Sequence, residues 1–190
     1  MTQISNGWPP TIIKKWNRLS RKEKSFILWD VRFCKLGAVE ANAKTAQDAA
    51  KENYPAEKGK GDKRDAFRHA LWQALNVQSV GEGMTRDWAN AHEYETPQDE
   101  LIDMYMDVHN NEVGIEIGVA NPKASLKELC RVIKERISNG DMLIINGNEN
   151  DLIKSNGTPV KPSEIRGLDS ASKIAIDILN SRNNETEQSY

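Results

Sequence analysis

Apolar residues recur every three or four positions through most of the chain, which predicts a series of α-helices separated by short Gly- and Pro-containing breaks. A lead segment covers residues 1–19. Ser20 and Glu23 then have the spacing of a helix-capping box. The helices that we expect run from Ser20 through Cys34 and over residues 37–52, 62–80, 84–94, 98–118, 125–138 and 169–180.

Residues 139–167 have a different pattern. Two short apolar runs, one within Asp141–Gly147 and one near Ile153, are flanked by Asn-Gly steps, which is typical of a β-hairpin. The sequence therefore predicts a mainly α fold, a compact helical domain with a small C-terminal β-hairpin. Residues 20–120 would form the helical domain that carries the site. Residues 121–182 would add a helix, the hairpin and a further helix, followed by a flexible tail over 183–190.

Composition sets limits on the kind of protein. The chain has 190 residues, 38% of them hydrophobic and 28% charged, which suits one domain with a modest core. The net charge of −2 gives no overall attraction to nucleic acid, and we predict no nucleic-acid partner. Basic residues cluster over 14–24 and 58–64. These clusters are interpreted as solvated faces, with a phosphate-binding rim as the alternative.

The two cysteines and the N-terminal residues indicate in which cellular compartment the protein is made. Cys34 and Cys130 are far apart in apolar helical patterns, so we expect buried free thiols and no disulfide scaffold. The N-terminal residues lack the long apolar core that a secretory signal would have, and no apolar run in the sequence approaches the length needed to span a bilayer. We expect synthesis in the cytoplasm, and any export would use a route that needs no classical signal peptide.

All three histidines lie in clusters of acidic or amide residues. In the helix expected over 62–80, one face holds a polar set that suits a buried site better than solvent, and the opposite face is apolar. Asp65 and His69, one turn apart, could bind one metal ion or act as an oriented carboxylate–imidazole pair. A surface ion pair is the alternative. The polar face consists of Asp65, His69, Trp72, Gln73 and Asn76.

The helix expected over 98–118 repeats this pattern on a face that holds Asp103, Asp107, Asn110, Gly114 and Gly118. Two carboxylates one turn apart repel each other unless a cation or a raised pKa intervenes. The glycines destabilise a helix, which makes sense if another helix or a ligand approaches the backbone there. A charged outer face with incidental glycines is the alternative.

The other two histidines are less clear from spacing. His109 lies about 200° around the helix from Asp107, which favours a structural, hydrogen-bonded role. The His92-Glu93 pair ends a short helix and by itself is typical of a solvated helix end. A role for this pair in a site is favoured because three helices joined by short loops are expected to be neighbours, which would bring the pair between the two polar faces.

If the three helices converge, their side chains suggest metal chemistry. Nitrogen and carboxylate ligands suit Zn²⁺, or Mn²⁺ with a more oxygen-rich shell, and such a metal lowers the pKa of a bound water. Arg68 with Lys58, Lys60 and Lys63 could hold an anionic substrate group. A metal-free general-base site on His69 stays open. The expected ligands are Asp65, His69, His92, Asp103 and Asp107.

The sequence lacks a Gly-x-Ser-x-Gly elbow, a Walker-type phosphate loop and a His-Glu-x-x-His motif. These absences argue against α/β-hydrolases, P-loop enzymes and zincin proteases.

Three ordered motifs resemble the signature of a poorly characterised bacterial domain family: Asp65-Ala-Phe-Arg-His-Ala, Ala91-His-Glu, and Met106-Asp-x-His-Asn-Asn-x-x-Gly. The resemblance covers about residues 20–120 and implies a mostly helical domain, found alone and in secreted or toxin-like bacterial proteins. It favours a shared site for His109 over a structural role. The residues that it groups as one site are Arg68, His69, His92, Glu93, Asp107, His109, Asn110 and Gly114.

We therefore expect a bacterial hydrolase, a metal-assisted enzyme that acts on a phosphoester or cell-envelope substrate. The resemblance adds an antibacterial effector role, with a cognate immunity or secretion partner. Asp65, His69, His92 and Asp107 would be ligands or the acid/base set, with Glu93 and His109 beside them. Arg68 would bind the anion and Asn110 would orient the substrate. The alternative is a non-enzymatic adaptor or immunity-type module in which the polar faces form a structural network.

Overall fold

The computed structural model describes residues 33–93, 101–147 and 151–173. The lead segment, most of the helix expected from Ser20 and the C-terminal tail lie outside the described residues. Within these described ranges, the α-helices α3 to α7, a short 3₁₀ helix and an antiparallel hairpin confirm the predicted fold class. In chain order the elements are α3 (Phe33–Asn53), α4 (Lys63–Val80), α5 (Glu82–Glu93), α6 (Leu101–Ala120), α7 (Leu126–Asn139), β1 (Leu143–Asn146), β2 (Asp151–Lys154) and η2 (Pro162–Glu164).

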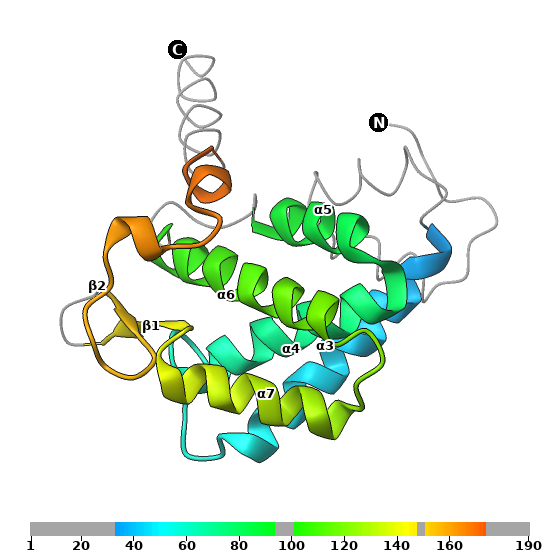
Figure 1. Ribbon diagram of the computed structural model, residues 1–190, viewed down its shortest axis with the longest axis horizontal. Helices are drawn as coiled ribbons and strands as arrows, with labels where there is room; N and C mark the ends of the chain where they lie inside the picture. Colours follow the sequence, from blue (N-terminus) through cyan, green and yellow to red (C-terminus); the bar gives the residue numbers. More distant parts are fainter. Residues whose placement is uncertain (1–32, 94–100, 148–150, 174–190) are drawn as a thin grey trace, which may run out of the picture.

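Helix α4 is the central element of the fold. It contacts α3, α5, α6 and α7, and α6 crosses it along most of its length (Figure 1). Phe67 and Leu71 on α4 are fully buried and pack in one core cluster with Leu129 and Ile133 of α7. A helix surrounded in this way can hold polar side chains only if each finds a partner, so the polar face of α4 must pair with its neighbours.

The local sequence accounts for most helix ends. Asp62 caps α4 by accepting hydrogen bonds from the backbone N–H groups of Arg64 and Asp65. Ser125 and Glu128 form the capping box that starts α7, and Gly140 ends α7 in the left-handed conformation that glycine favours.

Two predicted breaks differ in the structure. Gly81 alone separates α4 from α5, and Gly83 lies inside α5 rather than in the break. Helix α3 runs through Gly37 without interruption, because the single glycine weakens a helix without ending it.

The crossing of α4 and α6 depends on two glycines. A Cβ atom at Gly114 would lie 2.4 Å from the carbonyl oxygen of Ala70, and one at Gly118 would lie 2.9 Å from that of Ala74. Any side chain at these positions would force the helices apart. The expectation that another helix approaches this face is therefore confirmed, and the alternative of incidental glycines on an outer face is wrong.

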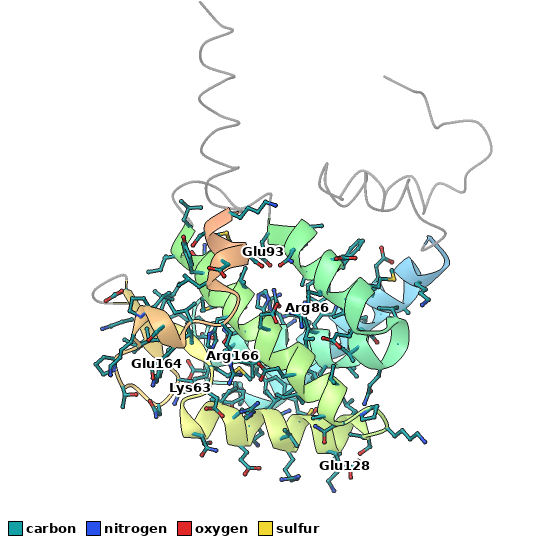
Figure 2. All side chains as sticks on the ribbon, turned by 45° about the horizontal axis from the view of Figure 1, so that its top comes forward. Lys63, Arg86, Glu93, Glu128, Glu164 and Arg166 are labelled. Carbon is teal, nitrogen blue, oxygen red and sulfur yellow. The ribbon has the colours of Figure 1, made fainter. Side chains whose placement is uncertain are left out.

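The hairpin is fastened to the helical layer by its first strand. β1 and β2 pair in antiparallel register, with Leu143 opposite Lys154. The Ile145 backbone N–H donates to the Gly61 carbonyl at 2.7 Å, which ties β1 to the loop before α4. Figure 2 shows Glu164 beside the hairpin and Glu128 at the distant end of α7. The hairpin thus closes one end of the α4–α6 layer.

Two further expectations can be compared with the structure. No described helix is both long and apolar enough to cross a membrane. Cys130 is a free thiol, as expected, but it is half-buried rather than buried.

Candidate metal centre

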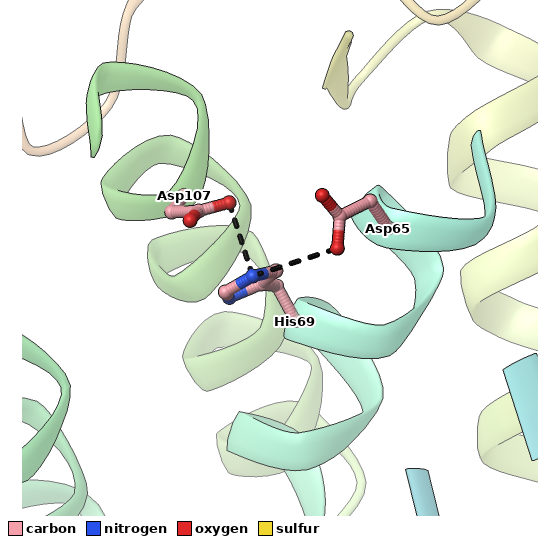
Figure 3. A group of neighbouring side chains, drawn as sticks. All are labelled: Asp65, His69 and Asp107. Atoms are coloured by element: carbon pink, nitrogen blue, oxygen red, sulfur yellow. Dashed lines mark ion pairs between the residues drawn. The ribbon is translucent and has the colours of Figure 1, made fainter. Parts of the chain in front are cut away.

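Asp65 and His69 from α4 and Asp107 from α6 bring their ligand atoms within 4.8 Å of one another (Figure 3). His69 Nε2 lies 3.0 Å from Asp107 Oδ1 and 3.8 Å from Asp65 Oδ1. The i,i+4 spacing places Asp65 and His69 on one face of α4, and the glycine-mediated crossing brings Asp107 to that face. The three side chains form the group within the described residues that could hold a metal ion.

The group is buried on one side and reaches solvent on the other. The His69 and Asp65 side chains are 3% and 6% exposed, whereas those of Asp107 and Arg68 are 18% and 28% exposed. A ligand would therefore enter from the Asp107 and Arg68 side.

The carboxylate of Asp65 is held at both oxygens. Oδ2 accepts the backbone N–H of Gly61 at 2.9 Å, so the loop before α4 fixes one end. Oδ1 accepts from Arg68, with Nε at 3.0 Å and Nη2 at 2.5 Å. These contacts turn Oδ1 toward His69 and Asp107.

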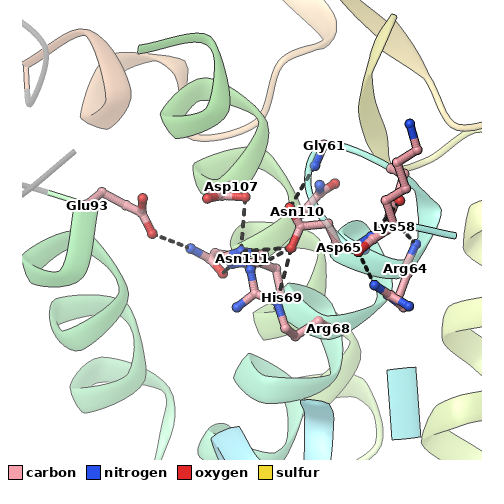
Figure 4. Close-up of polar contacts among 12 residues, drawn as sticks. Lys58, Gly61, Arg64, Asp65, Arg68, His69, Glu93, Asp107, Asn110 and Asn111 are labelled. Atoms are coloured by element: carbon pink, nitrogen blue, oxygen red, sulfur yellow. Dashed lines mark hydrogen bonds and ion pairs between the residues drawn. The ribbon is translucent and has the colours of Figure 1, made fainter. Parts of the chain in front are cut away.

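Polar contacts link Glu93 to His69 through Asn111 (Figure 4). The Glu93 carboxylate can only accept, so the Asn111 Nδ2 group that lies 3.4 Å from it donates. Asn111 Oδ1 then faces His69 Nδ1 at 3.2 Å, and this nitrogen must carry the proton. Nε2 then carries the lone pair on the edge of the ring that faces the two aspartates and Arg68, and a metal-ligating histidine presents its lone pair to the ion in the same way.

A chain of buried amides supports Asn111 from behind. Gln73 donates to Asn111 Oδ1 at 3.1 Å, Asn76 donates to Gln73 at 3.3 Å, and Asn42 of α3 donates to Asn76 at 3.0 Å. Gln73 and Asn76 are fully buried, as their position on the predicted polar face suggested. Each amide donates to the next one in the direction of Glu93. The orientation of Asn111 is therefore held by the whole chain of hydrogen bonds and not by a single contact.

The electrostatic surroundings push His69 and Asp107 toward their neutral forms. Burial, followed by the nearby Arg68 charge, lowers the pKa of His69 well below its usual value. Burial also raises the pKa of Asp107, with further contributions from Glu93, Asp65 and Asp103, and Arg68 acts in the opposite direction. The Asp107 Oδ1 atom is buried and accepts no hydrogen bond from the described part of the chain, although His69 Nε2 lies near it.

His92 and Asp103, which we also expected as ligands, lie outside the three-residue group. His92 is exposed and packs edge-on against Trp72, with ring centroids 5.4 Å apart. Its electrostatic interaction with His69 contributes to the lowered pKa of His69, so His92 borders the group. Asp103 is half-buried one turn before Asp107 and acts on it electrostatically. The structure thus brings together three of the five residues that we expected as ligands, Asp65, His69 and Asp107. Glu93 is connected to His69 indirectly, through hydrogen bonds to Asn111.

His109 belongs to a different set of contacts. The backbone N–H of Arg166 donates to His109 Nδ1 at 2.9 Å, so Nε2 carries the proton and donates to the Asp141 carbonyl at 3.0 Å. Burial lowers the pKa of His109 to about 4. The ring borders a separate cavity of about 370 Å³ beside the hairpin. This geometry agrees with the structural role that its spacing favoured and separates it from the shared site that the resemblance implied.

The Asn110 side chain also forms its hydrogen bonds away from the candidate metal centre. Its Nδ2 donates to the Leu143 carbonyl at 3.0 Å and its Oδ1 accepts the Leu143 N–H at 2.9 Å. The amide thereby pairs with β1 as a neighbouring strand would, and anchors the hairpin to α6. Within the described residues the Asn110 amide bonds Leu143 and forms no hydrogen bond with Asp65, His69 or Asp107.

The expected anion-binding residues surround the start of α4. Lys58 and Lys60 are exposed and Lys63 is half-buried. Arg68 does not project freely into solvent, because its guanidinium bonds Asp65 and lies 2.6 Å from His69 Nε2.

Asn111 supports the group but was not among the site residues expected from the sequence, whereas Gln73 and Asn76 were placed on the polar face without an assigned role. The signal was present, since Asn111 lies one turn after Asp107 and Gln73 one turn after His69, on the same faces.

The comparisons with known proteins gave one result. No curated protein and no solved structure matched the chain. The sequence model of the family described as a domain of unknown function (DUF6973) matches residues 26–141, more than half of the chain. The match includes Asp65, His69 and Asp107 and the amides that support His69, and it ends before the hairpin. The chain therefore belongs to the DUF6973 family.

Proposed function

We propose that this protein is a metal-dependent hydrolase whose centre consists of Asp65, His69 and Asp107. The observation that carries the proposal is the buried Oδ1 atom of Asp107, which faces the His69 Nε2 lone pair without accepting a hydrogen bond from the described residues. A buried carboxylate oxygen without a donor is costly unless a cation compensates it. A divalent ion between the two atoms would supply that compensation.

The charge balance supports a cation at this place. Asp65, Glu93 and Asp103 each act to raise the pKa of Asp107, and Arg68 acts against them. Several carboxylates beside one guanidinium leave an excess of negative charge. A divalent ion would remove the excess and hold Asp107 ionised.

One imidazole nitrogen and two carboxylates form an oxygen-rich donor set, which suits Mn²⁺ and also accommodates Zn²⁺. The hydrogen bond from His69 Nδ1 to Asn111 is the outer-shell support that such ligands commonly have. The bound ion would lower the pKa of a water and provide hydroxide near neutral pH.

The substrate that we propose is anionic, a phosphoester or a cell-envelope component, because Arg68 lies on the open side of the group and exposed lysines precede α4. An antibacterial effector role, with a cognate immunity or secretion partner, extends the proposal on the strength of the sequence resemblance.

A second function is favoured by one observation. Arg68 already satisfies Asp65 and lies against His69 Nε2, and the amide chain links α3, α4 and α6. A network complete in itself could fix helix register in a non-enzymatic interaction module.

Calorimetric titration of the full chain with Mn²⁺ and with Zn²⁺ distinguishes the two functions. The hydrolase proposal expects one ion per chain, and at least about tenfold weaker binding in Asp107→Asn. Asp48→Asn is a matched control, since Asp48 is an exposed helical aspartate on α3. No binding by wild-type protein, together with large destabilisation by His69→Ala, would support the interaction module. Hydrolysis of a chromogenic phosphodiester by the loaded protein then tests the substrate class.

A further inference from the structure

Arg68 Nη2 lies between two of the proposed ligand atoms. It is 2.5 Å from Asp65 Oδ1 and 2.6 Å from His69 Nε2, and those two atoms are 3.8 Å apart (Figure 4). Since His69 Nδ1 carries the proton, Nε2 accepts from the guanidinium. A positively charged donor therefore makes the contacts that a metal ion would make.

The guanidinium and a metal ion cannot hold these contacts together. An ion about 2.0–2.2 Å from both ligand atoms would lie within about 3 Å of Nη2, whichever side of the pair it approached. Two cations at that separation repel strongly, and the Nε2 lone pair can serve one of them. Metal binding thus requires Arg68 to leave Asp65 and His69.

Arg68 can leave at low steric cost, because 28% of its side chain is already exposed. It begins on the side of the group that opens to solvent, where the Asp107 side chain is also partly exposed. A displaced guanidinium would remain beside the metal and could bind an oxyanion through two parallel N–H groups.

We propose that Arg68 is a built-in competitor for the metal that becomes the oxyanion-binding group when the metal displaces it. The inference rests on the proposed metal centre and adds its regulation and its ligand class, phosphate-like oxyanions. Metal and oxyanion should then bind cooperatively, each increasing the affinity for the other.

Zinc titrations of the full chain test the competition. We expect Arg68→Gln to bind Zn²⁺ about tenfold or more tightly than wild type, because no internal donor has to be displaced. Arg68→Lys should also bind more tightly, since an ammonium keeps the charge but lacks the planar fork. Arg131→Gln is the matched control, with its arginine paired to Glu135 on the exposed face of α7. Wild-type affinity in Arg68→Lys would show that the charge alone weakens metal binding, and it would overturn the proposal that the guanidinium competes by occupying the contacts to Asp65 and His69.

A nitrogen-15 spectrum of the arginine Nε–H groups gives a readout that a purely structural role would not change. The Arg68 signal, identified by its loss in Arg68→Gln, should shift and broaden when Zn²⁺ is added. Addition of inorganic phosphate to the zinc-loaded protein should shift it again and bind more tightly than to Arg68→Gln.

The two proposals fail in different ways. Zinc binding with equal affinity in wild type and Arg68→Gln, with an unchanged Arg68 signal, overturns the competition and leaves the metal centre intact. No zinc binding by wild type or by either Arg68 variant removes the metal centre itself.

Discussion

Gly114 on α6 lies in backbone contact with Ala70 on α4, so closely that a Cβ atom would lie 2.4 Å from the Ala70 carbonyl oxygen. Ala70 follows His69 directly, and Asp107 lies about two turns before Gly114. The contact therefore sets how near Asp107 comes to His69, and helix packing and the proposed chemistry depend on the same glycine.

Gly114→Ala should destabilise the protein by about 2–3 kcal/mol, because the added methyl group has no room between the helices. It should also weaken metal binding by moving Asp107 away from His69. Urea unfolding measures the first effect and calorimetry the second. Gly83→Ala is the control, since Gly83 is exposed in α5 and an added methyl group would meet nothing within 4 Å, and we expect no loss of stability. Equal stability of the two variants would contradict the packing argument.

Glu93→Gln should weaken metal binding by about 10–100-fold with little loss of helix content, because an amide no longer forces Asn111 to donate. Asn111 could then turn over and leave His69 Nδ1 without its acceptor. Circular dichroism and metal titration together measure this, with Glu135→Gln on the surface of α7 as the matched control. Unchanged affinity in Glu93→Gln would show that Asn111 does not set the tautomer.

Asn110→Ala should lower the free energy of unfolding by about 2–4 kcal/mol, because both backbone groups of Leu143 lose their buried partner. Metal affinity should change little, since the Asn110 amide bonds Leu143 and forms no hydrogen bond with Asp65, His69 or Asp107. Asn139→Ala, at the exposed end of α7, should change stability by less than about 0.5 kcal/mol. A loss of metal binding that exceeded the loss of stability would restore Asn110 to the site.

His109 should make the protein acid-sensitive. Its pKa falls to about 4 in the folded state, below the usual value of 6.5, so the unfolded chain binds the proton first. Its contribution to stability is complete above pH 6.5 and is lost as the pH falls from 6.5 toward 4, by about 2–3 kcal/mol. Unfolding measured at pH 7, 5.5 and 4.5 should show a smaller decrease in His109→Gln than in wild type. Parallel pH profiles would mean that His109 keeps an ordinary pKa.

The helices and their polar faces could be predicted because they depend on local rules. The side chains of Asp62 and Ser125 cap helices through neighbouring backbone groups, and Gln73 and Asn76 fall on the face of Asp65 by simple helical periodicity. The glycines of α6 also pointed to a close helix neighbour, although periodicity alone does not say which helix.

The membership of the site could be predicted only in part, because the partner of each polar side chain is set by tertiary contacts. Asn110 and Asn111 are adjacent and chemically identical, yet one binds the hairpin and the other supports His69. His109 lies in the family-like motif, but its two ring nitrogens form hydrogen bonds with the backbones of Asp141 and Arg166, which are distant in sequence. Arg68 was expected to face a substrate, but its guanidinium contacts Asp65 and His69 Nε2. This contact depends on the conformation of the long arginine side chain, which the spacing in the sequence does not determine.

Anomalous diffraction from crystals of the full chain grown with Mn²⁺ tests the metal centre most directly. The account predicts one ion bonded at about 2.0–2.3 Å to Asp65, His69 Nε2 and Asp107, with the Arg68 guanidinium moved off Asp65. Crystals that contain no manganese at this position, with Arg68 still lying between Asp65 and His69, would contradict it.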